Sequence, residues 1–343
     1  MLAGAAAQGA YEAGVLDVLA SSDLDVVRIV GSSAGALNGA AFAAACRAGR
    51  REAGAREIVD VWRDEAGFGD VFHLRPRDWL PFRGLADQKK VLGILRDSVK
   101  VHPPVRPINL KLIVTTLDGD VDRIGPPPGD PRRGACVDAP AGFDATTYEH
   151  VCDFADADFD TDDGLGRVFD AAVASAALPG AFAPYRLPGV GLCIDGGATN
   201  NTPIGHALDG ELGQRIDAVI VIAPTVELRP PVGDLAGLPL AGHLVDVLIN
   251  ERLYRDLKLA EDLNMALDAL DRLVTDGVLD ARQLAAVKQA LAWQEARRTE
   301  IVRIRPLEPV PGDVLSGFWH REQREALIEI GRERAKQVLA AWC

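Results

Sequence analysis

Ser33 is the side chain of this sequence best placed to act as a nucleophile. It stands at the centre of Gly31-Ser32-Ser33-Ala34-Gly35, between the apolar run 26–30 and the alanine-rich run 36–45. A strand, a tight Gly-x-Ser-x-Gly turn and a helix in this order form a nucleophile elbow, which exposes the serine hydroxyl at the positive end of the helix. The pattern predicts that Ser33 attacks an electrophile and that Gly31 and Gly35 leave room for the turn.

A serine hydroxyl needs a base beside it, and Asp195 is the candidate. Asp195 follows the short apolar run 192–194 and precedes Gly196 and Gly197. Its carboxylate is therefore expected at the end of a strand, where open α/β sheets build their sites, although a carboxylate that only caps this turn would fit the same residues. None of the histidines lies in a glycine-flanked loop after a late strand, the usual place of the base in an α/β-hydrolase; they are His73, His102, His150, His206, His243 and His320.

An acyl-transfer site also needs hydrogen-bond donors for the oxyanion. Gly4, Ala5, Ala6 and Ala7 stand between a short apolar stretch and a helix expected at 10–19. Small side chains let backbone N–H groups come close to a tetrahedral intermediate. We therefore expect an oxyanion hole in these four residues, while a plain strand–helix connection would have the same composition.

Together these segments resemble the patatin-like phospholipases. That family combines a glycine-rich oxyanion loop, a Gly-x-Ser-x-Gly elbow and a later Asp-Gly-Gly or Asp-Gly-Ala, which correspond here to residues 4–14, 31–35 and 195–197. The segments 175–182 (Ser-Ala-Ala-Leu-Pro-Gly-Ala-Phe) and 200–203 (Asn-Asn-Thr-Pro) are similar to two further segments of the family.

The resemblance implies a three-layer α/β/α sandwich with a mainly parallel central sheet, plus an additional helical segment. It also implies that Ser33 is the nucleophile and Asp195 the general base of a dyad that needs no metal and no cofactor, and that the substrates are acyl esters of glycerolipids. One departure concerns the oxyanion loop, which in the family is typically Gly-Gly-Gly-x-Arg-Gly. Here alanines replace two glycines and Gln8 takes the place of the arginine. The lost positive charge is expected to weaken contact with phosphate-bearing substrates.

The leading hypothesis is a lipid acyl hydrolase of the phospholipase A type, acting through an acyl-enzyme. The alternatives are an esterase or thioesterase on soluble acyl compounds, a catalytically weak interaction protein whose helices at 243–298 bind a partner, and a histidine-dependent α/β-hydrolase. The apolar cluster Trp79-Leu80-Pro81-Phe82 is expected to line the acyl pocket, to contact a membrane surface peripherally, or to lie in the core. The oligomeric state stays open.

Composition narrows the class of protein. The 343 residues are 48% hydrophobic and 25% charged, which is an ordinary globular composition. The formal net charge of −13 argues against nucleic-acid binding, which needs a basic face, and against simple electrostatic attraction to anionic lipids. We expect a cytoplasmic protein, peripheral at membranes if it contacts them, because the sequence has no basic signal-peptide start and no apolar run long enough for a membrane span. The five widely spread cysteines point to reduced thiols.

Strands and helices alternate along the chain, which favours a mainly parallel sheet covered on both faces. We expect one domain over residues 1–343, with an acidic loop or lid-like insertion at 126–166 and a helical insertion at 236–298 before the last strand. The other expected strands are 110–116, 218–222 and 301–304, and the other expected helices are 37–48, 56–62, 88–99, 168–177, 243–274, 283–298 and 321–339.

Overall fold

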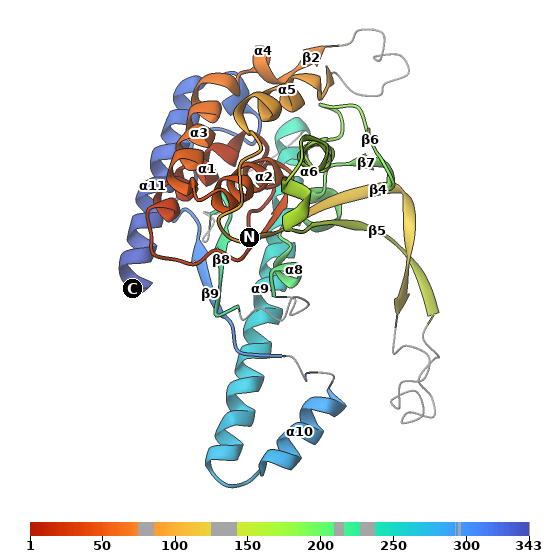
Figure 1. The fold of residues 1–343 in the computed structure, drawn as a ribbon, viewed down its shortest axis with the longest axis vertical. Helices are drawn as coiled ribbons and strands as arrows, with labels where there is room; N and C mark the ends of the chain where they lie inside the picture. The colour runs from red at the N-terminus through yellow and green to blue at the C-terminus, as the bar shows by residue number, and fades with distance from the viewer. Residues whose placement is uncertain are drawn as a thin grey trace.

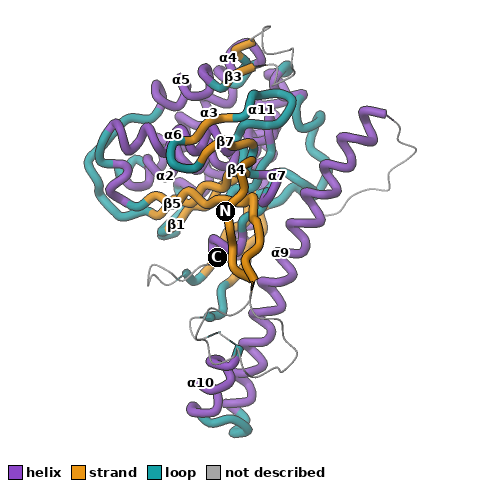
Figure 2. Tube along the Cα trace, turned by 90° about the vertical axis from the view of Figure 1, so that its right-hand side faces the viewer, coloured by secondary structure: helices purple, strands orange, loops and turns teal. Residues whose placement is uncertain are grey.

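The computed structural model describes residues 1–74, 86–124, 143–208, 216–226, 237–291, 293 and 296–342. It is a mixed α/β structure in which helices cover both faces of a central sheet (Figures 1 and 2). The expected three-layer architecture with a mainly parallel centre is confirmed. The cluster 79–82 lies outside the described residues.

The parallel centre of the sheet contains four strands and a short fifth segment. Strand β1 (Arg28–Ser32) pairs with β4 (Asn109–Ile124), and β8 (Ala218–Ile222) pairs with β9 (Glu300–Ile304), both in parallel. Leu2 joins the two pairs, because it forms parallel bridges with Gly31 and with Ile222. Its N–H donates to the Val30 carbonyl (2.8 Å), and the Ala3 N–H donates to the Ile222 carbonyl (3.0 Å).

Antiparallel strands complete the sheet beside β4. Strand β5 (Phe143–Phe154) follows most of β4, and the two form a ribbon that extends away from the body (Figure 1). Strand β7 (Gly191–Ile194) pairs with the middle of β4 and with β6 (Tyr185–Leu187). Neither β5 nor β6 was predicted from the sequence.

Successive residues of the central strands point to opposite faces of the sheet, and each face has its own apolar core. Leu2, Ile29 and Ile222 belong to the larger core, and Val30 and Val221 belong to the smaller one. The helices around the larger core are α1 (Gly9–Ala20), α2 (Ala34–Arg47), α3 (Arg51–Asp60), α5 (Lys89–Ser98), α6 (Asp162–Ser175) and α11 (Arg321–Trp342). The helices on the other face are α7 (Gly197–Asn200), α8 (Ile204–Leu208) and α9 (Gly237–Thr275).

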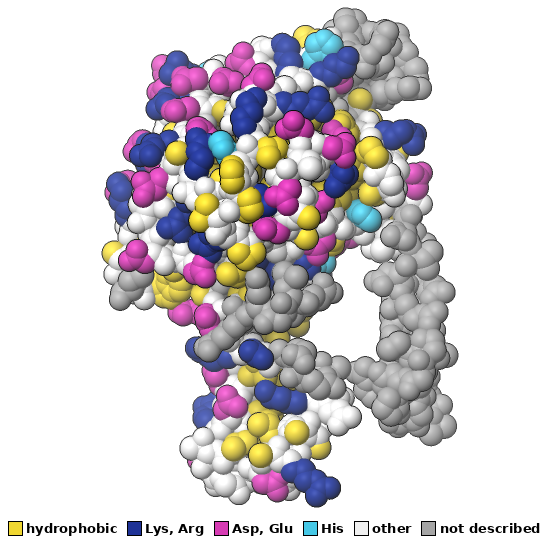
Figure 3. All heavy atoms as spheres, viewed as in Figure 1, with side chains coloured by type: hydrophobic (Ala, Val, Ile, Leu, Met, Phe, Trp, Pro, Cys, Tyr) yellow, Lys and Arg dark blue, Asp and Glu magenta, His cyan; other side chains and the backbone are white. Residues whose placement is uncertain are grey.

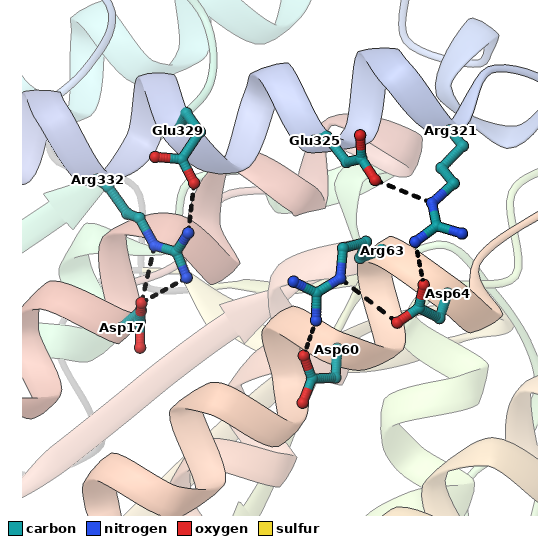
Figure 4. Close-up of polar contacts among 8 residues, drawn as sticks. All are labelled: Asp17, Asp60, Arg63, Asp64, Arg321, Glu325, Glu329 and Arg332. Atoms are coloured by element: carbon teal, nitrogen blue, oxygen red, sulfur yellow. Dashed lines mark hydrogen bonds and ion pairs between the residues drawn. The ribbon is translucent and has the colours of Figure 1, made fainter.

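Helix α11 crosses α1 at very short range. A Cβ added at Gly331 would lie 2.1 Å from the Tyr11 carbonyl oxygen, and one added at Gly14 would lie 2.0 Å from the Ile328 carbonyl oxygen. Arg332 of α11 bonds to Asp17 of α1 at 2.7 Å, at the edge of this contact (Figure 4). Helices this close require glycine on both sides, since any side chain would meet backbone atoms.

Helix α9 runs past the body of the molecule, and its C-terminal part projects with α10 (Ala281–Ala290) as a helical hairpin (Figures 1 and 2). We call residues 265–291 the arm. At its root the Asn264 side chain exchanges two hydrogen bonds with the backbone of Thr299. Figure 3 shows hydrophobic side chains on the surface of the projecting end, and Met265 and Val278 are more than half exposed. The predicted helix 283–298 was too long, because α10 ends at Ala290.

The aspartate-rich part of the segment 126–166 has regular structure where the structure describes it. It contains the end of β5, a 3-10 turn at Asp156–Phe159 and the first turn of α6, which Thr161 caps. Asp156 and Asp160 pair with Arg47, a side chain that is only 2% exposed. The remaining short elements are α4 (Phe68–Val71), β2 (His73–Leu74), β3 (Ala86–Asp87) and the helical turns Ala6–Gln8, Val61–Glu65 and Ser316–Phe318.

Within the described residues, no helix combines the length and the apolar character that a membrane span requires.

Candidate active site

The strand register explains why Ser33 and Asp195 meet. Strand β1 runs parallel to β4 and ends with Ser32 opposite Ile113, whereas β7 runs antiparallel to β4 and ends with Ile194 opposite Thr115. The C-terminal ends of β1 and β7 therefore face each other along the same edge of β4. The residue after each of these strands lies beside Val114. These residues are Ser33 and Asp195.

Ser33 sits in a strained turn between β1 and α2. Its backbone has φ 53° and ψ −126°, a conformation that costs a residue with a side chain free energy. Its Oγ donates a hydrogen bond to Asp195 Oδ2 at 2.7 Å, and its N–H donates to Ser175 Oγ at 2.9 Å. The turn therefore holds the hydroxyl against a carboxylate and fixes the backbone below it.

The carboxylate of Asp195 is buried and oriented at both oxygens. Oδ2 accepts from Ser33, and Oδ1 accepts from the Gly197 N–H at 2.7 Å. Burial raises the pKa of Asp195 from 3.8 to about 6, and the hydrogen bonds from Ser33 and Gly197 oppose that rise. A carboxyl group with this pKa can accept a proton in one step and return it in the next near neutral pH.

The glycines of the two turns are required by close backbone contacts. A Cβ at Gly35 would lie 2.6 Å from the Leu2 carbonyl oxygen, and one at Gly31 would lie 2.4 Å from the Gly35 carbonyl oxygen. On the other turn, a Cβ at Gly196 would lie 2.1 Å from the Ile113 carbonyl oxygen, and one at Gly197 would lie 2.4 Å from Asn201 Oδ1. Side chains at these positions would push the elbow away from Leu2 and the Asp-Gly-Gly turn away from β4 and Asn201.

The segment Gly4 to Ala7 lies beside Ser33. A Cβ at Gly4 would lie 2.9 Å from Ser33 Cβ, and the Gly4 N–H donates to the Asn201 carbonyl at 3.0 Å. The Ala7 N–H donates to the Val314 carbonyl at 2.9 Å. Ala6 has φ 45°, a value that is strained for a residue with a Cβ, and it lines the same cavity as Ser33. The structure thus commits the N–H groups of Gly4 and Ala7 to backbone carbonyls, while it gives no such partner for those of Ala5 and Ala6.

An apolar cavity opens at the dyad. It contains about 1290 Å³ of empty space, part of it open to solvent, and both Ser33 and Asp195 line it. Its walls come from α2, α3, the helical turn 61–65 and α5, and the stacked rings of Phe72 and Phe182 also line it. A long apolar group attached to the reacting carbonyl would have room here.

Two residues that support the dyad had no role assigned to them from the sequence. Ser175 accepts from the Ser33 N–H and donates to the Ile113 carbonyl. Thr115 Oγ1 donates to the Asp195 carbonyl at 2.8 Å. Ser175 stands in the segment 175–182 that resembles the family, whereas nothing in the sequence marks Thr115.

The histidines for which the structure gives side-chain partners bond to other groups. His73 contacts Asp87, His206 contacts Glu149, and His102 contacts Arg50 at the far end of the cavity. The Ser33 hydroxyl donates its hydrogen bond to Asp195.

Comparisons with known proteins identify the family of this chain. A family model described as patatin-like phospholipase matches residues 1–208. The crystal structure of VipD from Legionella pneumophila is similar with a TM-score of 0.40 and 12% sequence identity. The similarity covers 99% of this chain and 66% of the VipD chain, so the chain spans slightly less than two thirds of that protein. No curated protein matches the sequence.

Proposed function

Because this chain belongs to the patatin-like phospholipase family, which supports a lipid acyl hydrolase activity at the family level, we propose that it cleaves fatty-acyl esters through a Ser33–Asp195 dyad. The observation that carries the proposal is the 2.7 Å hydrogen bond from Ser33 Oγ to Asp195 Oδ2 at the opening of an apolar cavity. A nucleophile bonded to its base, beside room for an acyl chain, is the arrangement that ester hydrolysis needs.

In the first half of the reaction, Ser33 Oγ attacks the ester carbonyl carbon and its proton passes to Asp195 Oδ2. The carbonyl π electrons move to oxygen, and backbone N–H groups stabilise the resulting oxyanion. We assign this role to Ala5 and Ala6, since Gly4 and Ala7 donate to carbonyls, together with Ala34, the residue after the nucleophile. Collapse of the intermediate expels the alkoxide, which takes the proton from Asp195 and leaves as the alcohol.

In the second half, water attacks the acyl-enzyme and Asp195 accepts its proton. Collapse of the second tetrahedral intermediate releases the fatty acid, and the proton on Asp195 returns to Ser33 Oγ. The buried position of Asp195 suits this alternation, because its pKa of about 6 lies close to the working pH.

The same pKa predicts opposite effects of pH on activity and on stability. The base must be ionised, so kcat/KM should fall about tenfold per pH unit below pH 6 and be constant above it. The folded pKa is raised above 3.8, so the contribution of Asp195 to stability is full below about pH 4 and is lost as the pH rises through about 6. Asp195→Asn should therefore abolish hydrolysis yet stabilise the protein at pH 8, by up to about 3 kcal/mol in chemical denaturation.

The proposal is tested with wild type, Ser33→Ala, Asp195→Asn and the matched control Ser32→Ala. Ser32 is the neighbouring serine, and its buried Oγ has no hydrogen-bond partner in the described structure. On a short p-nitrophenyl ester, Ser33→Ala and Asp195→Asn should lose at least about a thousandfold in kcat, while Ser32→Ala should stay within a few-fold of wild type. Retained activity in either dyad variant would refute the mechanism.

Phospholipid vesicles, assayed beside the soluble ester, separate the two substrate classes. Hydrolysis of vesicles at a higher kcat/KM than that of the soluble ester supports the lipid acyl hydrolase, and the reverse ratio indicates an esterase or thioesterase. A wild type that cleaves neither substrate and does not react with a serine-directed fluorophosphonate would favour an interaction protein.

A further inference from the structure

We propose that the cavity is a channel for a single acyl chain, that it runs along α2, and that its length limits the chain to about 16 carbons. This inference rests on the proposed function, since it assumes that the ester carbonyl reacts at Ser33.

The cavity follows one face of α2 from its first residue almost to its last. Leu37, Ala41 and Ala44 line it, and they are spaced by four and three residues, so they lie on the same side of the helix. All three are partly exposed, whereas Phe42 and Ala43 between them are buried in the core. The alanines leave a groove along the helix surface that a larger side chain would fill.

The opposite walls are also apolar along this length. Ile58 comes from α3, Val61 from the turn that follows it, and Ile94 and Leu95 from α5. Leu95 is the buried residue of α5, which otherwise turns charged side chains such as Lys89, Lys90 and Arg96 to solvent. Helix α5 thus covers the groove with its apolar side, and a methylene chain between α2 and α5 would be shielded from water.

Charged and polar groups stand at the end far from Ser33. Arg50 pairs with Glu57 at 2.9 Å and contacts His102 Nε2 at 2.8 Å, and all three line the cavity. A terminal methyl group that reached them would displace water from charged groups without replacing their hydrogen bonds, which is unfavourable. This cluster therefore marks the limit of the apolar channel.

The length of α2 gives the number of acyl-chain carbons that the channel can hold. Its 14 residues rise about 21 Å at 1.5 Å per residue. An extended chain with C–C bonds of about 1.5 Å advances roughly 1.25 Å per carbon, so about 16 carbons reach the C-terminal end of α2, shortly before Arg50. By the same measure Ala41 lies about 9 carbons, and Ala44 about 13 carbons, from the reacting carbonyl.

The test is a chain-length series of p-nitrophenyl esters from 2 to 18 carbons, with wild type, Ala41→Phe, Ala44→Phe and the control Ala48→Phe. Ala48 follows α2 directly and does not line the cavity. For wild type and Ala48→Phe, kcat/KM should rise to about 16 carbons and fall at 18. Relative to its own kcat/KM on the 2-carbon ester, Ala44→Phe should lose at least tenfold above about 13 carbons, and Ala41→Phe at least tenfold above about 9.

The proposal requires that Ala41→Phe shortens the longest accepted acyl chain more than Ala44→Phe does. Identical profiles for all four proteins, or the same cut-off for Ala41→Phe and Ala44→Phe, would overturn the channel while leaving the dyad intact. Loss of activity on the 2-carbon ester in Ser33→Ala confirms the proposed function separately, and its absence refutes that function instead. Melting temperatures identify a variant that fails to fold, and in that case Ala41→Leu and Ala44→Leu replace the phenylalanine variants with the same expected order.

Discussion

Two pairs of helices in this protein differ sharply in how they pack. Helices α1 and α11 touch through backbone atoms at Gly14 and Gly331, and Arg332 and Asp17 bond across their edge (Figure 4). The C-terminal end of α9 and the whole of α10 form the arm, and α10 has no buried residue. The first pair is part of the large core, whereas the second projects from the body (Figure 1).

This difference in packing indicates which helices the site depends on. Helix α1 begins at Gly9, directly after the segment 4–7 beside Ser33, so whatever fixes α1 also fixes that segment. Helix α11 does this through Gly331, and the Ala7 N–H bonds to Val314, just ahead of α11. We expect hydrolysis of a soluble ester to depend on α11 and to be independent of the arm.

The largest effect is expected for Gly331→Ala. The new Cβ would lie 2.1 Å from the Tyr11 carbonyl oxygen, so the helices must separate, at a cost of about 3 kcal/mol. Denaturant unfolding measures the change, and kcat on the soluble ester should fall with it. The control is Gly277→Ala in the arm, where no atom lies within 4 Å of the new Cβ and where the positive φ of 70° costs about 1 kcal/mol locally. Equal losses of activity in the two variants would contradict the expectation that the site depends on α11 and not on the arm.

A smaller effect is expected for Arg324→Met in α11. The buried guanidinium donates to the carbonyls of Trp62 (2.7 Å), Gly317 (2.7 Å) and Arg63 (3.0 Å), and methionine would leave all three without this donor. We expect a loss of about 2 kcal/mol in unfolding free energy. Arg324→Lys keeps one donor and should recover part of it. Unchanged stability in Arg324→Met would show that these carbonyls do not need the guanidinium.

The smallest effect is expected for Asp280→Ala at the start of α10. Asp280 Oδ1 accepts from the Gln283 N–H, and the Asp280 N–H donates to Gln283 Oε1, both at 2.8 Å. Loss of this capping box should cost about 1 kcal/mol, confined to the arm. Hydrogen exchange should become faster in residues 281–290 and stay unchanged in α11. Any reduction of kcat on the soluble ester would contradict the independence of arm and site.

The parts of the fold that were predictable are those with a strong local pattern. The apolar run before Ser33 and the alanines after it predicted β1 and α2, and the strand-end position of Asp195 predicted where its carboxylate would be. Strand β5 escaped prediction because Glu149, Asp153 and the aspartates that follow give the segment 126–166 a polar, acidic composition typical of a solvated loop. Strand β6 has only three residues, too few for a periodicity to be visible.

The supporting contacts of the site were beyond sequence reasoning for a different reason. Ser175 is 142 residues from Ser33 along the chain, and its bond to the Ser33 N–H depends on where α6 ends relative to β4. The positive φ of Ala6 could not be predicted either, because alanine rarely adopts this conformation. Both features are set by tertiary packing, which a local pattern does not record.

The short segment around Leu2 at the centre of the sheet has a consequence for how the protein reaches its native state. Its neighbours are β1, about 30 residues away, and β8, which begins at Ala218, so the sheet closes only after contacts of very long sequence separation form. Such topologies fold slowly, because the chain loses the conformational entropy of closing the large loop before the stabilising contacts form. On the ribosome, Leu2 and Ala3 must wait for more than 200 residues of synthesis before their second neighbour exists. We therefore expect refolding to be limited by insertion of this segment, with an intermediate in which the two halves of the sheet are formed but not joined.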